Sequence, residues 1–171
     1  VVIPGQSSAQ FQPTAAQVGK FVLSGITVSN QTEPVAHYSA STTIVAADPA
    51  YVSGMSVSVP SPATGGAPRA GFDVVATPGT WSGTPAPTYT YQWYLCESIR
   101  TTTASSIPDN CDVIQATADR LTITADMVGL FPLVRITGSN IAGTLDVYSP
   151  TTAKAVTVPP TETQAPSLSG N

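Results

Sequence analysis

The chain has 171 residues, which is enough for one domain of ordinary size and part of a second. Charged residues make up 9% of the chain and the net charge is −4, so there is no basic surface for a phosphate backbone and nucleic-acid binding is not expected. No apolar run approaches the ~18 residues that a membrane-spanning helix needs, so no membrane span is expected either. The 13 glycines and 16 prolines favour many turns and few helices.

The predicted strands are short and are separated by turns rich in glycine, proline and serine, such as PSPATGGAP and SNIAG. The first three are assigned from an internal repeat that is described next. In chain order the strands cover residues 10–12, 21–29, 35–45, 55–59, 72–81, 88–96, 120–125, 132–140 and 144–158. The only helical signal is TADMVG (124–129), which we interpret as a single turn at a strand corner. Short strands at this spacing predict an all-β, antiparallel sandwich.

Residues 11–45 align without a gap with residues 121–155, at an offset of 110. In this alignment 13 of 35 positions are identical. The identical residues in the first copy are Thr14, Ala15, Val18, Gly19, Phe21, Leu23, Ile26, Thr27, Ser29, Asn30, Tyr38, Ser39 and Thr42. Self-similarity at a fixed spacing is the signature of a tandem array.

The repeat divides the chain into three expected parts. Residues 1–50 correspond to the C-terminal half of a repeat, residues 51–160 to a complete repeat, and residues 161–171 to a linker or the first strand of a next repeat. The first part lacks the equivalent of residues 51–110. Either the chain is an excerpt of a longer array, which we favour, or a neighbouring subunit supplies the missing strands by strand addition.

The segment LTITADMVGLFPL (121–133), followed by SNIAG, resembles the immunoglobulin-like pattern for strand E, the E–F corner and strand F. More closely, TPGTWSGTPAPTYTYQWYLC (77–96) with a later cysteine is similar to bacterial immunoglobulin-like repeats, which occur in tandem in secreted surface proteins and in bacteriophage structural proteins. The resemblance implies an immunoglobulin-like β-sandwich in which Trp93 is the strand C tryptophan and Phe131 replaces the corner tyrosine. Leu133 and an apolar residue near Val75 then stand at the positions of the usual core cysteines. We expect one core made of Trp93, Leu121, Ile123, Phe131, Leu133 and Ile136.

The two cysteines of the chain, Cys96 and Cys111, are expected to form a disulfide, because the resemblance places apolar residues at the core cysteine positions. The alternative is two free thiols in a reducing compartment. A bridge that closes a loop of ~15 residues stabilises by roughly 3 kcal/mol in the chain-entropy model. A local cysteine pair in a threonine- and serine-rich β-sequence favours an extracellular setting, at a cell surface or a virion surface.

Few residues offer chemistry. His37, the single histidine, has no histidine counterpart at the equivalent position Val147, so a catalytic role is not expected. The stretch PDNCD (108–112) falls short of a calcium loop. Asp126 is expected to accept backbone hydrogen bonds at a corner turn. Asn30 begins an N-glycosylation pattern, which would be accidental in a bacterial or phage protein. We therefore predict no catalytic residue, cofactor or metal. Trp81, placed in a turn, is the one candidate for stacking on a ligand, although turn tryptophans more often cap the sandwich.

The expected function is that of a non-enzymatic structural or assembly module in a surface fibre, an adhesin stalk or a virion. Its partners would be neighbouring repeats or subunits of the same protein. The alternatives are a module that binds surface carbohydrate or a receptor through loops at one end of the sandwich, and an accessory domain of a secreted enzyme.

Overall fold

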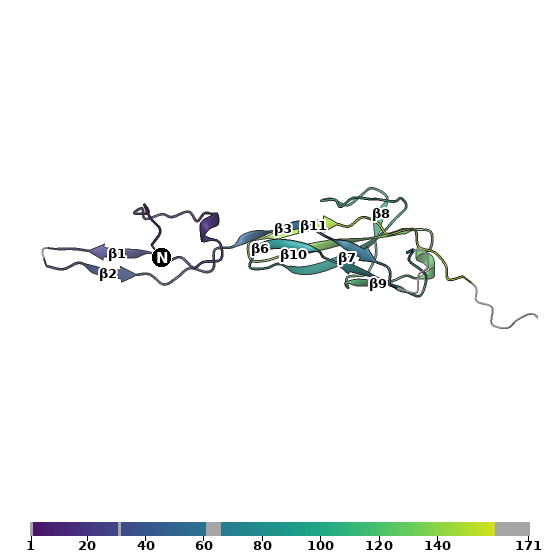
Figure 1. The fold of residues 1–171 in the computed structure, drawn as a ribbon, viewed down its shortest axis with the longest axis horizontal. Coiled ribbons are helices and arrows are strands. Elements are labelled where there is room, and N and C mark those ends of the chain that lie inside the picture. Colours follow the sequence, from purple (N-terminus) through teal and green to yellow (C-terminus); the bar gives the residue numbers. More distant parts are fainter. Residues whose placement is uncertain (1, 31, 61–65, 160–171) are drawn as a thin grey trace, which may run out of the picture. The chain divides into compact units, whose positions relative to one another are not determined.

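The computed structural model describes residues 2–30, 32–60 and 66–159, and within them the chain is nearly all β (Figure 1). The elements in chain order are η1 (Ala15–Gln17), β1 (Gly25–Val28), β2 (Val35–Tyr38), β3 (Ala47–Ser53), β4 (Ser56–Ser58), β5 (Asp73–Thr77), β6 (Thr80–Thr84), β7 (Thr88–Cys96), β8 (Cys111–Val113), β9 (Arg120–Thr122), η2 (Ala125–Met127), β10 (Phe131–Ser139) and β11 (Thr144–Tyr148). The two η elements are single turns of 3₁₀ helix.

Backbone contacts divide the chain into two compact units. The first contains the described residues of Val1–Val52 together with Trp81–Thr88 and Gly138–Leu145. The second contains Ser53–Thr80, Tyr89–Thr137 and the described residues of Asp146–Asn171.

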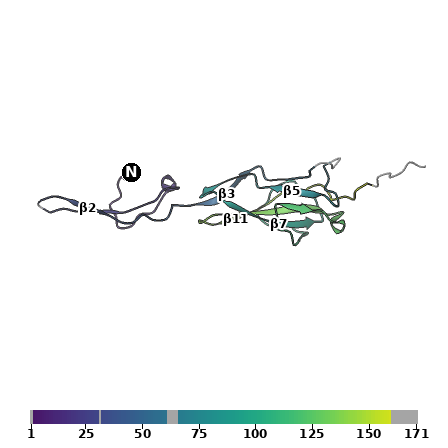
Figure 2. The same cartoon turned by 90° about the horizontal axis from the view of Figure 1, so that it is seen from below.

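Within the described residues the strands form four sheets, with the orders β1-β2, β3-β6, β4-β5-β9 and β11-β10-β7-β8. The pairs β1-β2, β4-β5, β5-β9 and β7-β8 are antiparallel. In the second unit, β5 and β7 belong to different sheets and lie in different layers (Figure 2). This arrangement is consistent with the predicted β-sandwich.

The core of the second unit is centred on Trp93 of β7, which is completely buried. Its indole Nε1 donates a hydrogen bond to the carbonyl oxygen of Ala118 at 2.9 Å, so the one polar atom of the ring has a partner. Leu121, Ile123 and Ile136 are buried as predicted.

Two members of the predicted core lie elsewhere. Leu133 is fully buried, but it clusters with Tyr94, Cys96 and Tyr148. Trp93 and Tyr94 are neighbours on one strand and therefore point to opposite faces of the sheet. Phe131 is only partly buried and packs against the same second cluster, together with Ala104 and Cys111. The sheet β11-β10-β7-β8 thus carries apolar side chains on both faces, and the expected single core is divided between them.

Several predicted strands have different bounds in the structure. Strand β7 is found as predicted, and η2 is the predicted corner turn. Residues 153–158 form no strand beyond an isolated bridge from Val156 to Arg69, and residues 10–12 form no strand at all. In the second unit the equivalent of residues 10–12 is β9, which pairs with β5. Among the described residues of 1–50 no strand is equivalent to β5. Strand β3 crosses the predicted boundary after residue 50, and residues 161–171 lie outside the described residues.

Candidate functional site

The N-terminal hairpin, residues 11–45, is the part of the first unit that the repeat relates to residues 121–155. Its strands β1 and β2 pair with Gly25 opposite Tyr38 and Val28 opposite Val35. Beyond the strands, further backbone hydrogen bonds close the hairpin, among them Ser39 N–H to Ser24 O at 2.9 Å, Thr42 N–H to Val22 O at 2.7 Å and Val45 N–H to Lys20 O at 2.9 Å.

The same backbone hydrogen bonds recur in the second unit at the offset of 110. Ser149 N–H donates to Val134 O at 2.8 Å, Thr152 N–H to Pro132 O at 2.9 Å and Ala155 N–H to Leu130 O at 2.8 Å. The turns η1 and η2 also begin 110 residues apart, at Ala15 and Ala125. Each of these three bonds of the hairpin therefore has a counterpart in the second unit.

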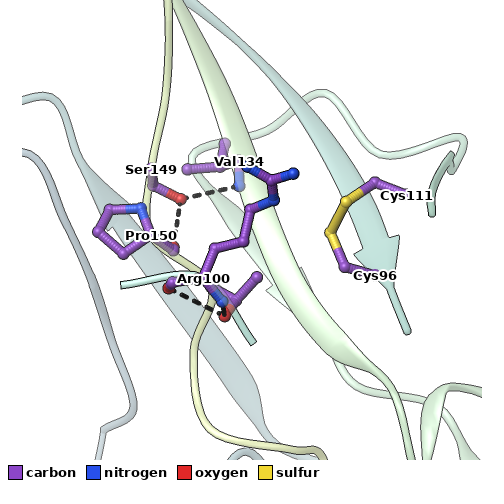
Figure 3. The surroundings of a disulfide bond; sticks show 7 residues. Cys96, Arg100, Cys111, Val134, Ser149 and Pro150 are labelled. Atoms are coloured by element: carbon purple, nitrogen blue, oxygen red, sulfur yellow. Dashed lines mark hydrogen bonds between the residues drawn. A yellow bond between two sulfur atoms is a disulfide. The ribbon is translucent and has the colours of Figure 1, made fainter. Parts of the chain in front are cut away.

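Serine side chains reinforce both copies in the same way. In the second unit the hydroxyl of Ser149 accepts from Val134 N–H at 3.1 Å and donates to Pro150 O at 2.8 Å (Figure 3). In the hairpin the hydroxyl of Ser39 accepts from Ser24 N–H at 3.0 Å and donates to Ala40 O. A buried hydroxyl group needs hydrogen-bond partners within the protein. Ser39 already has two partners equivalent to those of the buried Ser149, so its hydroxyl group would remain paired if the hairpin were covered.

The two copies differ sharply in burial. Leu23 is 52% exposed and its counterpart Leu133 is 0% exposed. Tyr38 is 72% exposed, against 7% for Tyr148. The hairpin thus has the backbone of a packed half-domain, but its apolar side chains face solvent in the structure.

A groove of about 430 Å³ lies on this exposed hairpin. It is lined by Phe11, Pro13, Val22, Leu23, Ser24, Ser39, Thr42, Thr43, Ile44 and Val45. The counterparts of most of these residues in the second unit are buried, among them Leu121, Ile123, Pro132, Val134, Ser149, Thr152 and Ala155. We call this surface the hairpin groove, and it occupies the place where the second unit has its core.

The edge of β1 is also open within the described residues. Strand β10, which contains the counterpart of β1, lies between β11 and β7. Strand β1 has only β2 as a neighbour. An unpaired strand edge is a ready template for pairing with another strand, so the hairpin presents both an apolar groove and unpaired backbone groups.

The predicted disulfide is present, and Cys96 of β7 is bonded to Cys111 of β8 at an S–S distance of 2.05 Å (Figure 3). The loop that it closes folds back on the sheet. Ala104 exchanges backbone hydrogen bonds with Tyr148 at 3.0 and 2.8 Å. Tyr94 belongs to the cluster with Leu133 and Tyr148, and burial there raises the pKa of its hydroxyl group. The disulfide loop therefore covers the second face of the sheet.

Trp81 lies in strand β6 and not in a turn as predicted. Its ring is half-buried and stands edge-on to Tyr51, with a centroid distance of 5.6 Å. The ring also lies directly on Gly138, because a Cβ atom there would come within 2.7 Å of Trp81 Cζ3. Trp81 thus packs against Tyr51 and Gly138.

A second groove, of about 370 Å³, lies at the loop end of the first unit. It is lined by Pro85, Ala86, Thr88, Ser139, Asn140 and Ile141, with no aromatic ring among them. Asn140 holds the loops together, since its Nδ2 donates to Ala47 O at 2.8 Å and to Pro85 O at 2.9 Å.

The remaining polar candidates are not brought together. His37 is exposed on β2. The pKa of Asp126 is lowered by a hydrogen bond from the Thr124 side chain and by one from the backbone of Asp126 itself. Among the described residues no three histidine, cysteine or acidic side chains lie close enough to hold a metal ion. No helix of the described part is long and apolar enough to cross a membrane.

Comparison with known proteins found no matching family model, no matching curated protein and no matching solved structure.

Proposed function

We propose that the chain is a non-enzymatic structural module built from tandem immunoglobulin-like repeats, and that it assembles into a surface fibre, an adhesin stalk or a virion. The observation that carries this proposal is the recurrence of one hydrogen-bonded half-domain at an offset of 110, buried in one copy and exposed in the other. A half-domain that exposes its apolar face suits a molecule whose units are completed by their neighbours.

Further features support this reading. A buried Trp93 on β7, a corner turn η2 and a following long strand β10 are the features of the resemblance to immunoglobulin-like repeats. The disulfide suits an extracellular location, where such bonds persist. The proposed location is the surface of a cell or of a virion.

The test is to label the intact source with an antibody raised against the 171-residue chain and to view it by negative-stain electron microscopy. We expect gold label along fibres or on the surface of particles. Label confined to the cytosol would contradict the proposal.

A second candidate function is recognition of carbohydrate or a receptor at the loop-end groove. The observation that favours it is Ile141, which is 67% exposed beside the anchored Asn140. A glycan array and a receptor screen would test it, with Ile141→Asp as the variant that should lose binding. If the Ile141→Asp variant binds as well as the original chain, this groove is not the binding site.

A further inference from the structure

We propose that the hairpin groove is the acceptor for the tryptophan-bearing half of an immunoglobulin-like repeat, that is, for strands with the sequence pattern of residues 51–110. This inference deepens the proposed function and rests on it. The ligand is therefore a protein segment of stated pattern, which inserts a tryptophan side chain and pairs with the open edge of β1.

The second unit shows what covers the counterpart of the groove. Strand β7 lies beside β10 and carries Trp93 into the core. Strand β5 lies beside β9, with Val74 opposite Leu121. The counterpart of Leu121 is Phe11, which lines the groove. An incoming half-repeat would thus place its tryptophan and its valine over the positions that are equivalent to those covered in the second unit.

The repeat also predicts the hydrogen bonds of the complex. In the second unit Trp93 N–H donates to Ala116 O at 3.0 Å, and its indole Nε1 donates to Ala118 O at 2.9 Å. At the offset of 110 the corresponding carbonyl groups belong to Gln6 and Ser8. Both residues are exposed in the structure. The two carbonyl groups at the start of the hairpin are expected to receive the tryptophan of the partner.

A second copy of these 171 residues would not cover every half-repeat. Residues 1–171 contain two C-terminal halves, residues 11–45 and 121–155, and a single tryptophan-bearing half, residues 51–110. If two copies exchanged their tryptophan-bearing halves, each would still leave one C-terminal half uncovered. The occupant that we propose is therefore a tryptophan-bearing half-repeat additional to the one at residues 51–110.

The probe is a synthetic peptide with the sequence of residues 86–98, in which Cys96 is replaced by serine and lysine tags are added at both ends for solubility. It is added to the full 171-residue chain, and amide hydrogen exchange is measured at residues 21–28 and at residues 131–138. At ten times the dissociation constant, exchange at residues 21–28 should slow about tenfold. Residues 131–138 should not change, because β10 already has β7 beside it.

Two controls make the result specific. A peptide with Trp93→Ser should give no protection, since the groove is then not filled. In the chain, Ser24→Glu places a charge in the groove, at the counterpart of the fully buried Val134, and should abolish the peptide effect. Ser24 is exposed in the free hairpin, so the variant should fold, and Thr27→Glu on the opposite face should still respond to the peptide.

Three results would overturn the inference. The first is a peptide that leaves exchange at residues 21–28 unchanged. The second is equal protection by the Trp93→Ser peptide. The third is a concentration-dependent dimer that protects residues 21–28 without peptide, which would make a second copy the occupant. Antibody labelling of the source does not depend on the peptide, so surface label with a negative peptide result would leave the proposed function standing while this inference fails.

Discussion

Leu23 and Leu133 provide a matched pair, because the same residue occupies equivalent positions in two copies of one hairpin. Leu133 is 0% exposed and belongs to the cluster with Tyr94 and Tyr148, whereas Leu23 is 52% exposed. Replacing a buried leucine by alanine removes apolar contacts and leaves a cavity, which costs about 2–5 kcal/mol. A surface substitution usually changes stability by no more than about 0.5 kcal/mol.

We therefore expect Leu133→Ala to lower the free energy of unfolding by about 2–5 kcal/mol and Leu23→Ala to change it by less than about 0.5 kcal/mol. Urea unfolding is followed by far-ultraviolet circular dichroism, which reports on all strands. Limited proteolysis of residues 1–50 gives a local readout, and its rate should be the same in Leu23→Ala as in the original chain. A loss above about 2 kcal/mol or faster cleavage in Leu23→Ala would refute the reasoning, because it would mean that Leu23 is covered.

Three further predictions concern the two units. Trp93→Phe should destabilise the chain by about 1–3 kcal/mol in a urea titration, because it removes the indole hydrogen bond and leaves the carbonyl oxygen of Ala118 unpaired. Full retention of stability would count against a buried indole. Reduction of the Cys96–Cys111 bond should lower the urea midpoint by an amount equivalent to about 3 kcal/mol, and an unchanged midpoint would mean that the bond does not stabilise the fold. Gly138→Ala should destabilise by about 1–3 kcal/mol, because its Cβ would meet the Trp81 ring, and a neutral effect in thermal unfolding would show that the ring can move aside.

The strand pattern of the second unit could be predicted from the sequence where alternation and turn residues agree. TYTYQWYLC is strand β7 as predicted, because it alternates and ends before a polar loop. The disulfide was expected because the resemblance places apolar residues at the core cysteine positions, which leaves Cys96 and Cys111 to pair with each other. The burial of Trp93 followed from its place on a strand with the pattern of a sandwich core.

The two-faced sheet could not be predicted in the same way. We placed Leu133 and Ile136 in one core, but residues three apart on a strand point to opposite faces. A strict period of two would have separated them. What the pattern lacks is any signal that residues 97–110 fold back over the second face, because the pairing of Ala104 with Tyr148 joins segments that are distant in sequence. The repeat did indicate that Phe11 and Leu23 lack a covering strand, but the groove residues Pro13 and Thr42 were not singled out, although the repeat relates them to Ile123 and Thr152.

The central claim is that residues 11–45 form the same half-domain as residues 121–155 but without its covering strands. Residue-resolved amide hydrogen exchange of the 171-residue chain alone tests it most directly. Core amides exchange only by large-scale unfolding, whereas uncovered strands open locally. We therefore expect exchange at residues 131–138 to be slower than at residues 21–28 by a factor of about a thousand or more. Equal protection of the two segments, in a chain whose solution mass is that of a monomer, would contradict the claim, because the hairpin would then be covered within its own chain.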